Sequence, residues 1–285
     1  DPMCMSFEAL LELGRAYEAA QPDMWDAEID KAKPEDLMIL TYTSGTTGPP
    51  KGAMIMQQNM MFMMQSLQRC FGIYPTDEQL GFLPLAHVAG RMFYTFSVIE
   101  SGAVVNLVEG PDTVVQDLQE VEPSIHFAVP RVWEKQFSSV AIKLKEGTSI
   151  GRWAYETALK IGTRRAERLK KGESIPFGLN VQFKVADFLV FKNIRRLLGI
   201  DKCRWLSTAA APIAPDLIDW YWAIGKPMYE CYGQTECTGI ATSNFPDDFR
   251  IGSVGKAAED VEVVLSEDNE ILIRSAGVIK GYWNK

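Results

Sequence analysis

The sequence of 285 residues is poor in cysteine and histidine and contains no long hydrophobic run. Its five cysteines, at positions 4, 70, 203, 231 and 237, do not have the spacing of a metal-binding motif. We interpret them as reduced thiols of an intracellular protein. No apolar run approaches the roughly 18 residues that a membrane-spanning helix requires, and no secretory leader is recognisable. We therefore expect a cytoplasmic protein.

Charge is unevenly distributed along the chain. Residues 151–204 contain 13 Lys and Arg against 5 Asp and Glu, a net charge of +8, whereas the whole chain carries −8, so the remainder carries −16. A basic segment in an acidic protein indicates either an anionic partner or a solvated helical face, and the sequence leaves both readings open. Peripheral contact of 151–204 with an anionic membrane is one expectation. Basic and aromatic residues do not interleave as in a nucleic-acid groove, so we expect no nucleic-acid partner.

The order of predicted elements indicates an α/β protein with parallel sheets flanked by helices. The composition, 47% hydrophobic and 23% charged, is that of a globular chain. Strands are predicted at 37–40, 80–83, 103–107, 124–129, 204–207 and 228–232. Helices are predicted at 6–20, 57–70, 88–100, 112–121 with Asp112 as its cap, 131–146, 152–171, 184–198 and 214–224, and 23–36 is expected to be an acidic linker. After residue 250 the pattern predicts a hairpin of 261–265 and 270–274. We therefore divide the chain into an α/β core at 1–249 and the start of a small β subdomain at 250–285.

The most informative stretch is Tyr42–Gly52, which follows a predicted buried strand. Its three glycines allow backbone N–H groups to surround an anion, its hydroxyls add donors, and Lys51 adds a positive charge. It is not a Walker loop, because Gly52 follows Lys51 and Pro49-Pro50 disfavours a helix here. The segments 43–48, 207–212 and 233–239 each follow a predicted strand. They can therefore converge at one edge of a parallel sheet.

Four other segments contain residue types that suit a binding site. Tyr232–Gly239 combines a flat aromatic ring at Tyr232 with the carboxylate of Glu236, which suits a base and a magnesium ion. Ser207–Pro212 is a run of small residues that allows close approach of a ligand. His87 lies in Leu83–Val88, and Trp133 lies in Val129–Lys135. The other histidine, His126, shares one face of a predicted strand with Ser124 and Ala128, and we expect it to be structural.

The Tyr42–Gly52 and Tyr232–Gly239 segments resemble the two signatures of the adenylate-forming enzymes, and they occur in the same order along the chain. This family includes acyl-CoA synthetases, luciferases and peptide-synthetase adenylation domains. Val129–Lys135 resembles a segment of the long-chain acyl-CoA synthetases. The resemblance runs from about residue 33 to residue 285. It implies the N-terminal domain fold of these enzymes and a ligase reaction in two steps. A fatty acid and ATP give an acyl-adenylate and pyrophosphate, and coenzyme A then displaces AMP. The implied cofactors and partners are ATP, Mg²⁺, coenzyme A and a fatty acid.

The resemblance also implies roles for individual residues. Thr46 and Glu236 would hold Mg²⁺, and Ser44, Thr47 and Lys51, with the backbone at Gly45 and Gly48, would hold the outer phosphates. Ala210, Ala211, Glu230, Cys231, Tyr232, Gly233 and Thr235 would line the adenine and α-phosphate site. His87 would face the reacting carboxylate and Trp133 would stand at the mouth of a fatty-acyl tunnel. His87, Thr46, Glu236 and Lys51 are thus the catalytic candidates.

The sequence departs from the family pattern in several places. Alanines replace the usual glycine in 207–212, and Gly90 stands where many relatives have glutamate. Ala276–Trp283 resembles the approach to a Thr-Gly-Asp segment that is absent here, as are the ribose-binding aspartate, the hinge and the C-terminal domain with its catalytic lysine. We therefore expect this chain to bind ATP weakly and to be nearly inactive alone. Two alternatives stay open: an enzyme for aryl or amino acids within the same superfamily, and a non-catalytic scaffold with a degenerate nucleotide pocket.

Overall fold

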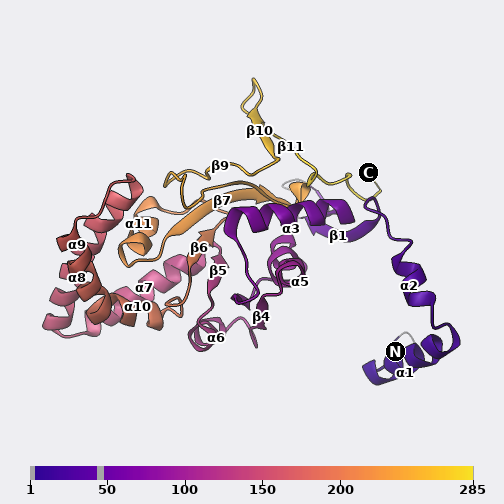
Figure 1. The fold of residues 1–285 in the computed structure, drawn as a ribbon, viewed down its shortest axis with the longest axis horizontal. Helices are drawn as coiled ribbons and strands as arrows, with labels where there is room; N and C mark the ends of the chain where they lie inside the picture. Colours follow the sequence, from indigo (N-terminus) through magenta and orange to yellow (C-terminus); the bar gives the residue numbers. More distant parts are fainter. Residues whose placement is uncertain (1–3, 44–47, 285) are drawn as a thin grey trace.

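The computed structural model describes residues 4–43 and 48–284 (Figure 1). The first two helices, α1 (Phe7–Ala20) and α2 (Met24–Ile29), extend away from the body of the molecule and bury no residue. The helix predicted at 6–20 is confirmed. The segment expected to be an acidic linker contains α2, which was not predicted.

The main sheet has five strands in the order β5-β6-β7-β8-β9. Strands β5 (Ile125–Ala128), β6 (Trp205–Thr208) and β7 (Met228–Gln234) are parallel, as predicted. Strands β8 (Gly239–Ser243) and β9 (Lys256–Ala257) add an antiparallel edge that the sequence did not indicate. Strands β3 (Glu78–Gly81) and β4 (Val104–Leu107) form a second parallel pair. This pair lies beside β5, and a hydrogen bond of 3.0 Å from the Ser124 N–H to the Glu78 carbonyl connects the two. The α/β fold class is confirmed.

The glycine-rich stretch of the sequence belongs to a hairpin. Strands β1 (Leu37–Thr43) and β2 (Lys51–Met56) are antiparallel, and Thr43 pairs with Lys51. The end of the chain adds to the same sheet, because the Met54 N–H donates to Gly281 over 3.0 Å and the Trp283 N–H donates to Gly52 over 2.8 Å. A separate hairpin of β10 (Glu262–Leu265) and β11 (Ile271–Arg274) projects from the body, in agreement with the sequence prediction (Figure 1).

The helices lie on both sides of these sheets. Helix α3 (Gln57–Phe71) packs Met60, Met63 and Met64 into the core, whereas Met61 is exposed. It contacts the η1 turn (Met92–Phe96), which separates α4 (Val88–Arg91) from α5 (Ser97–Ser101). Helix α6 (Val114–Val121) begins after Thr113, so the expected cap at Asp112 is wrong by one residue. Helices α7 (Pro130–Glu146), α8 (Ser149–Lys170) and α11 (Pro215–Ala223) gather at one end of the molecule (Figure 1).

The predicted helix at 184–198 is longer and irregular in the structure. It begins as α9 (Phe177–Ala186), passes through a π-helical turn, η2 (Asp187–Phe191), and continues as α10 (Lys192–Leu197). Among the described residues, no helix combines the length and the apolar character that a bilayer-spanning segment needs.

A buried ion pair connects three strands. The side chain of Asp77, which is 3% exposed, accepts hydrogen bonds from Arg204 Nη2 (2.5 Å), Ser124 Oγ (2.6 Å) and the Tyr74 N–H (2.8 Å). Burial alone would raise the pKa of Asp77, but the three hydrogen bonds and the charge of Arg204 outweigh burial. The pKa therefore lies below its ordinary value of 3.8.

This arrangement predicts acid sensitivity. Because the pKa of Asp77 is depressed in the folded state, ionised Asp77 stabilises the fold above about pH 4, and this contribution is lost as the pH falls below that range. Replacing Asp77 by Asn should lower the free energy of unfolding by about 1–3 kcal/mol at pH 7 and flatten its decline between about pH 4 and 2. Urea unfolding at a series of pH values measures both effects. An equal pH dependence in the two proteins would contradict the assignment.

Candidate functional site

A cavity of about 610 Å³ lies where the β1–β2 hairpin, the ends of β6 and β7, and the α4–η1 segment meet. The sequence predicted that the segments 43–48, 207–212 and 233–239 would converge on one crevice. Each of them contributes at least one described residue to the lining of this cavity. The lining residues are Thr43, Lys51, His87, Val88, Ala89, Met92, Phe93, Phe127, Ala209, Ala210, Cys231, Tyr232, Gly233, Gln234, Thr235, Glu236, Gly239, Ile240 and Tyr282.

Polar groups gather at the hairpin side of this cavity. Glu236 comes from η3 (Thr235–Cys237), directly after β7, and its Oε1 accepts a hydrogen bond of 2.7 Å from the Tyr282 hydroxyl. That hydrogen bond, with smaller contributions from burial and from the charge of Glu236, raises the pKa of Tyr282 to about 12. The ammonium of Lys51 lies 5.2 Å from the centre of the Tyr282 ring. A carboxylate, an ammonium and a neutral hydroxyl thus share one wall.

Tyr282 was not predicted as a site residue. It reaches the cavity because the segment around it pairs with β2, where Tyr282 lies opposite Ala53. The available signal was the Gly281-Tyr282-Trp283 string, which resembles a family segment. Nothing local to the string indicated that it folds back beside Lys51.

Four predicted phosphate-binding residues, Ser44, Gly45, Thr46 and Thr47, lie outside the described residues. Thr43 and Lys51 flank them, pair with each other and both line the cavity. Gly48 is described and has φ of +98°, a conformation that favours glycine, but it is not among the lining residues.

The end of β6 carries an alanine in a strained conformation. Ala210 lines the cavity with φ of +74°, in the left-handed region that an alanine side chain disfavours. Glycine adopts this backbone conformation without the steric penalty that the Ala210 side chain incurs. Ala211, predicted for the same site, does not line the cavity.

Relieving this strain should stabilise the protein. Replacing Ala210 by glycine removes a steric cost of about 1–2 kcal/mol and adds an entropic cost of roughly 0.5–1 kcal/mol, so we expect a net gain of about 0.5–1 kcal/mol in the free energy of unfolding. Ala209 is not among the residues with positive φ and serves as the matched control. Its replacement by glycine should destabilise by about 0.5–1 kcal/mol. Denaturant unfolding distinguishes the two, and a loss of stability in both would contradict the strain.

The end of β7 contributes Cys231, Tyr232, Gly233 and Thr235, all predicted for the nucleotide site. A bulge between Tyr232 and Gly233 turns the strand, and a Cβ at Gly233 would lie 1.6 Å from the Gly239 carbonyl oxygen. Glycine is therefore required there for close packing of β7 on β8. Burial raises the pKa of the Cys231 thiol to about 12, so this cysteine is a neutral packing group rather than a nucleophile.

Glu230, predicted for the nucleotide site, is not among the residues that line the cavity. Its Oε2 accepts a hydrogen bond of 2.8 Å from the Gly252 N–H. Burial raises the pKa of Glu230, although hydrogen bonds from the backbone at Gly252 and Ser253 oppose the shift. Glu230 therefore fastens the turn at 250–253 to the sheet.

Part of the cavity lining is apolar. It includes Val88, Met92, Phe93, Phe127 and Ile240, and the rings of Phe93 and Phe127 stack with their centres 4.6 Å apart. His87 stands at the exposed rim, where its Nδ1 accepts a hydrogen bond of 3.1 Å from the Ala89 N–H at the start of α4. At Gly90 a Cβ would lie 2.4 Å from the Pro84 carbonyl oxygen, so this position has no room for a side chain.

Trp133 is not at the mouth of this cavity, and its expected placement there is corrected. It is completely buried, and its Nε1 donates to the Ala128 carbonyl over 3.0 Å. Its ring contacts His126 and Tyr221, with centre distances of 5.2 and 5.3 Å. His126 is itself 2% exposed and burial lowers its pKa to about 4, which agrees with the structural role expected for it.

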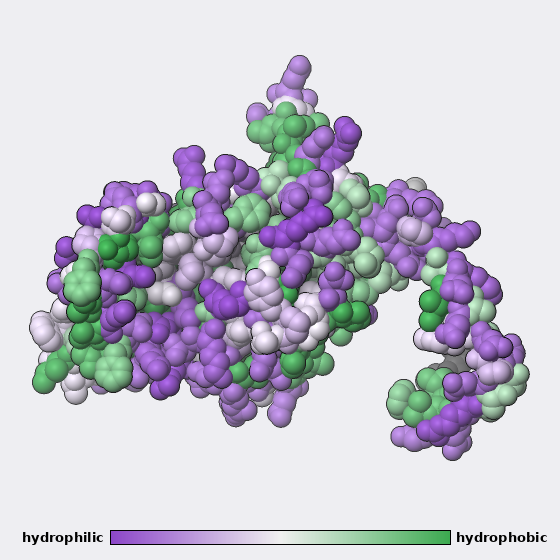
Figure 2. Space-filling view, in the orientation of Figure 1, coloured by the Kyte–Doolittle hydropathy of each residue, from purple (hydrophilic) through white to green (hydrophobic). Residues whose placement is uncertain are grey.

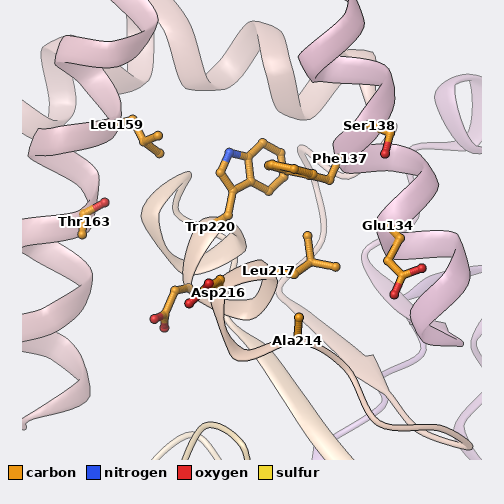
Figure 3. Close-up of a pocket in the computed structure, with 10 residues that line it drawn as sticks. Glu134, Phe137, Ser138, Leu159, Thr163, Ala214, Asp216, Leu217 and Trp220 are labelled. Atoms are coloured by element: carbon orange, nitrogen blue, oxygen red, sulfur yellow. The ribbon is translucent and has the colours of Figure 1, made fainter.

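Beyond Tyr221 lies a second cavity, of about 510 Å³, between α7, α8 and α11 (Figure 3). Trp220 packs edge-on against both Tyr221 and Phe137, and the rings of Trp220 and Phe137 face this cavity with Leu159 and Leu217 (Figure 3). Aromatic contacts from Trp133 to Tyr221 and from Tyr221 to Trp220 therefore lead to this second cavity, whose lining also includes the acids Glu134, Asp216 and Asp219.

The first cavity suits a magnesium ion that is held mainly by the phosphates of a bound substrate and only in part by the protein. No cluster of three or more His, Cys, Asp or Glu side chains that could hold a metal occurs among the described residues. Glu236 is the carboxylate that lines the cavity. Mg²⁺ commonly binds through one or two carboxylates together with substrate phosphates and water, so a single carboxylate fits this ion.

The sequence identifies the class. Residues 3–283 match the profile of the AMP-binding enzyme family, and the chain belongs to that family. The predicted resemblance to adenylate-forming enzymes is thereby confirmed.

Individual relatives agree with this assignment. A Mycobacterium tuberculosis protein named "Putative fatty-acid–CoA ligase fadD11" is 36% identical over 275 residues, covering 95% of this chain and 48% of the relative. The Xenopus laevis long-chain-fatty-acid–CoA ligase ACSBG2 is 31% identical, covering 99% of this chain and 39% of the relative. The chain thus spans about half or less of the length of these relatives.

Solved structures support the fold. The N-terminal domain of FACL13 from Mycobacterium tuberculosis superposes with a TM-score of 0.61 at 21% identity, covering 90% of this chain and 54% of that one. The o-succinylbenzoate CoA synthetase MenE from Bacillus subtilis, in complex with its acyl-adenylate, gives a TM-score of 0.59 at 21% identity and covers 89% of this chain and 43% of the other.

Proposed function

We propose that this chain provides the nucleotide- and acyl-binding site of a long-chain fatty-acid–CoA ligase that forms AMP. One observation carries the proposal: a single cavity is lined both by the polar side chains of Lys51, Glu236 and Tyr282 and by the rings of Phe93 and Phe127. The names of the relatives agree with it. ATP would bind along the polar wall, and the alkyl chain of a fatty acid would bind along the apolar wall.

The reaction would follow from this juxtaposition. A carboxylate oxygen of the fatty acid forms a bond to the α-phosphorus of ATP, and the bond from that phosphorus to pyrophosphate breaks. The thiolate of coenzyme A then attacks the acyl carbon, and AMP leaves. Two anions must approach each other in the first step, so neutralisation of charge is the main requirement. Lys51 supplies a positive charge at the polar wall, and Mg²⁺, when bound through Glu236 and Thr46, would supply more.

The remaining residues would orient the substrates. The base would lie beside Ala210 and the ring of Tyr232, whose π face suits stacking. Ser44, Thr47 and the backbone at Gly45 and Gly48 would hold the outer phosphates. His87, at the rim between the two walls, would face the reacting carboxylate.

Trp133 would act as a gate inside the protein and not as a residue at the mouth of the tunnel. Its contact with Tyr221, and the contact of Tyr221 with Trp220, connect it to the second cavity, which Trp220 lines. A shift of the Trp133 ring from its core position would open space for the far end of a long alkyl chain toward that chamber.

Calorimetry with non-hydrolysable acyl-adenylate mimics tests the proposal without requiring turnover. Mimics that carry a long alkyl, an aryl or an aminoacyl group are compared with AMP. The alkyl mimic should bind at least about tenfold tighter than the others, because only its chain buries against the apolar wall. Tighter binding of the aryl or aminoacyl mimic would favour an enzyme for those acids. No binding of any mimic would favour a non-catalytic scaffold.

A further inference from the structure

The outer face of the long helical segment 177–197 is apolar and uncovered. Its inner face buries Leu179, Phe183 and Ala186 in α9, followed by Phe191 and Ile194. On the outer face, Phe177 is 85% exposed, Phe188 is 74% exposed and Leu189 is 61% exposed, and Val181 and Val185 are also exposed. In the space-filling view, apolar residues gather at the left-hand end of the molecule, where α8, α9 and α10 lie (Figures 1 and 2).

The π-helical turn helps to create this face. Buried positions in α9 recur at intervals of three or four residues, but the step from Ala186 to Phe191 is five residues. The additional residue of a π turn returns Phe191 to the inner face and leaves Phe188 and Leu189 outside. The exposed side chains at 177, 181, 185 and 188 then follow helical spacing along one side.

The charges around this face are positive. Segment 177–197 contains four cations and the single acid Asp187, a net charge of +3. Arg195 is buried and pairs with Asp187 and Asp201, and Arg196 lies 3.9 Å from Asp201. Within the described residues this leaves Lys184 and Lys192 without an ion pair. Lys184 is exposed on the outer face itself and forms no ion pair with another described residue.

The neighbouring helix adds to the positive charge. Lys160, Arg164 and Lys171 on and after α8 are exposed and likewise form no ion pair within the described part of the chain. The helix also carries two exposed acids, Glu156 and Glu167, but its cations outnumber them. The surface thus joins an apolar stripe with phenylalanines to unpaired cations, in a protein whose remainder is strongly acidic. A large exposed apolar patch on a folded protein marks an interaction site, and this charge pattern selects an anionic partner with an apolar interior.

We propose that the outer face of 177–189, with Lys184 and the exposed cations of α8, docks on the surface of an anionic lipid bilayer. The helix would lie in the plane of the interface. Phe177, Val181, Val185 and Phe188 would enter the boundary between headgroups and acyl chains, while the lysines and Arg164 contact lipid phosphates. The basic segment 151–204 then has a partner, of which the helix 177–189 is the contacting part.

Co-sedimentation with vesicles tests this surface. The chain should bind vesicles made of equal parts phosphatidylcholine and phosphatidylglycerol, and should bind pure phosphatidylcholine vesicles at least about tenfold more weakly. Added salt should reduce binding to the mixed vesicles. Equal binding to both vesicles, or no binding to either, would overturn the proposal.

Variants locate the contact. The double replacement Phe177→Ser and Phe188→Ser should lower the partition into mixed vesicles by at least about tenfold, because two apolar anchors are lost. Lys184→Glu should lower it several-fold and reduce its dependence on salt. Ile99→Ser is the matched control, because Ile99 is 76% exposed on α5, outside this surface, and binding should not change. All of these side chains are exposed, and circular dichroism verifies that each variant folds.

One further outcome separates a bilayer from a protein partner. If the serine variants instead abolish self-association measured by sedimentation velocity, and leave vesicle binding unchanged, the apolar face is an interface between copies of the chain and the lipid proposal is wrong. Binding of the alkyl adenylate mimic should be the same in all variants, so this test is independent of the proposed function.

Discussion

Replacing Glu236 by Gln is expected to weaken the binding of Mg-ATP by about 10–100-fold. Glu236 is the carboxylate on the polar wall of the first cavity, where its Oε1 accepts the hydrogen bond from Tyr282. Glutamine has nearly the same shape and can still accept that hydrogen bond, but it removes the negative charge that a magnesium ion requires. The loss should therefore appear with Mg²⁺ present and largely disappear when ATP binds without the metal.

Calorimetry with and without Mg²⁺ measures this difference, and Glu230 provides a matched control. Glu230 lies on the adjoining strand β7, but its carboxylate accepts from Gly252 and does not line the cavity. The Glu230→Gln variant should lose stability and keep the wild-type dependence of ATP binding on Mg²⁺. Equal Mg²⁺ dependence in the wild type and the Glu236→Gln variant would remove Glu236 from the metal site.

Replacing Trp133 by Ala should lower the free energy of unfolding by about 3–5 kcal/mol. The ring is completely buried between His126 and Tyr221, and its Nε1 satisfies the Ala128 carbonyl. Removing it opens a void and leaves that carbonyl without its donor, and both effects destabilise the core. Urea unfolding measures the loss. Trp25 is 74% exposed on α2, and its replacement by Ala should change stability by less than about 0.5 kcal/mol.

The same variant tests the gate. Replacing Trp133 by Phe retains a ring and should recover most of the lost stability, while loosening the packing against Tyr221. We compare the affinity for a long-chain adenylate mimic with the affinity for a short-chain mimic. If Trp133 separates the two cavities, both variants should shift this ratio toward the long-chain mimic, compared with the wild type. Unchanged chain-length preference in the Phe variant would make Trp133 a packing residue only.

Local patterns in the sequence predicted most of the elements. The helices at 6–20, 57–70 and 131–146 and the hairpin at 261–274 depend on residue spacing and turn residues near in sequence, and the structure contains them. The parallel order of β5, β6 and β7 followed from alternation of strand and helix. The approach of Ala210, Tyr232 and Glu236 to one cavity followed from the rule that binding segments lie at the carboxyl ends of such strands. Lys51 reaches the same cavity from the antiparallel β1–β2 hairpin, to which this rule does not apply.

Contacts between distant residues explain what the sequence did not predict. Strand β2 forms because Lys51–Met56 pairs with β1 and with the end of the chain, whereas Pro49-Pro50 and Gly52 suggested a loop. Glu230 turns from the nucleotide site because its partner, the Gly252 N–H, is 22 residues away in sequence. Trp133 is held in the core by Tyr221, which is 88 residues away. The π turn at Asp187–Phe191 was not predicted, because it shows only as a five-residue step between the buried residues Ala186 and Phe191. The sequence alone does not tell which residues are buried.

A crystal structure of the chain with a non-hydrolysable long-chain acyl-adenylate mimic tests the central claim most directly. We predict that the phosphate will lie between the 43–51 hairpin and Glu236, with the base beside Ala210 and Tyr232 and the alkyl chain against Phe93 and Phe127. A mimic bound at another surface, or one whose alkyl chain leaves the cavity without touching the apolar wall, would contradict the assignment of this cavity to acyl-adenylate chemistry.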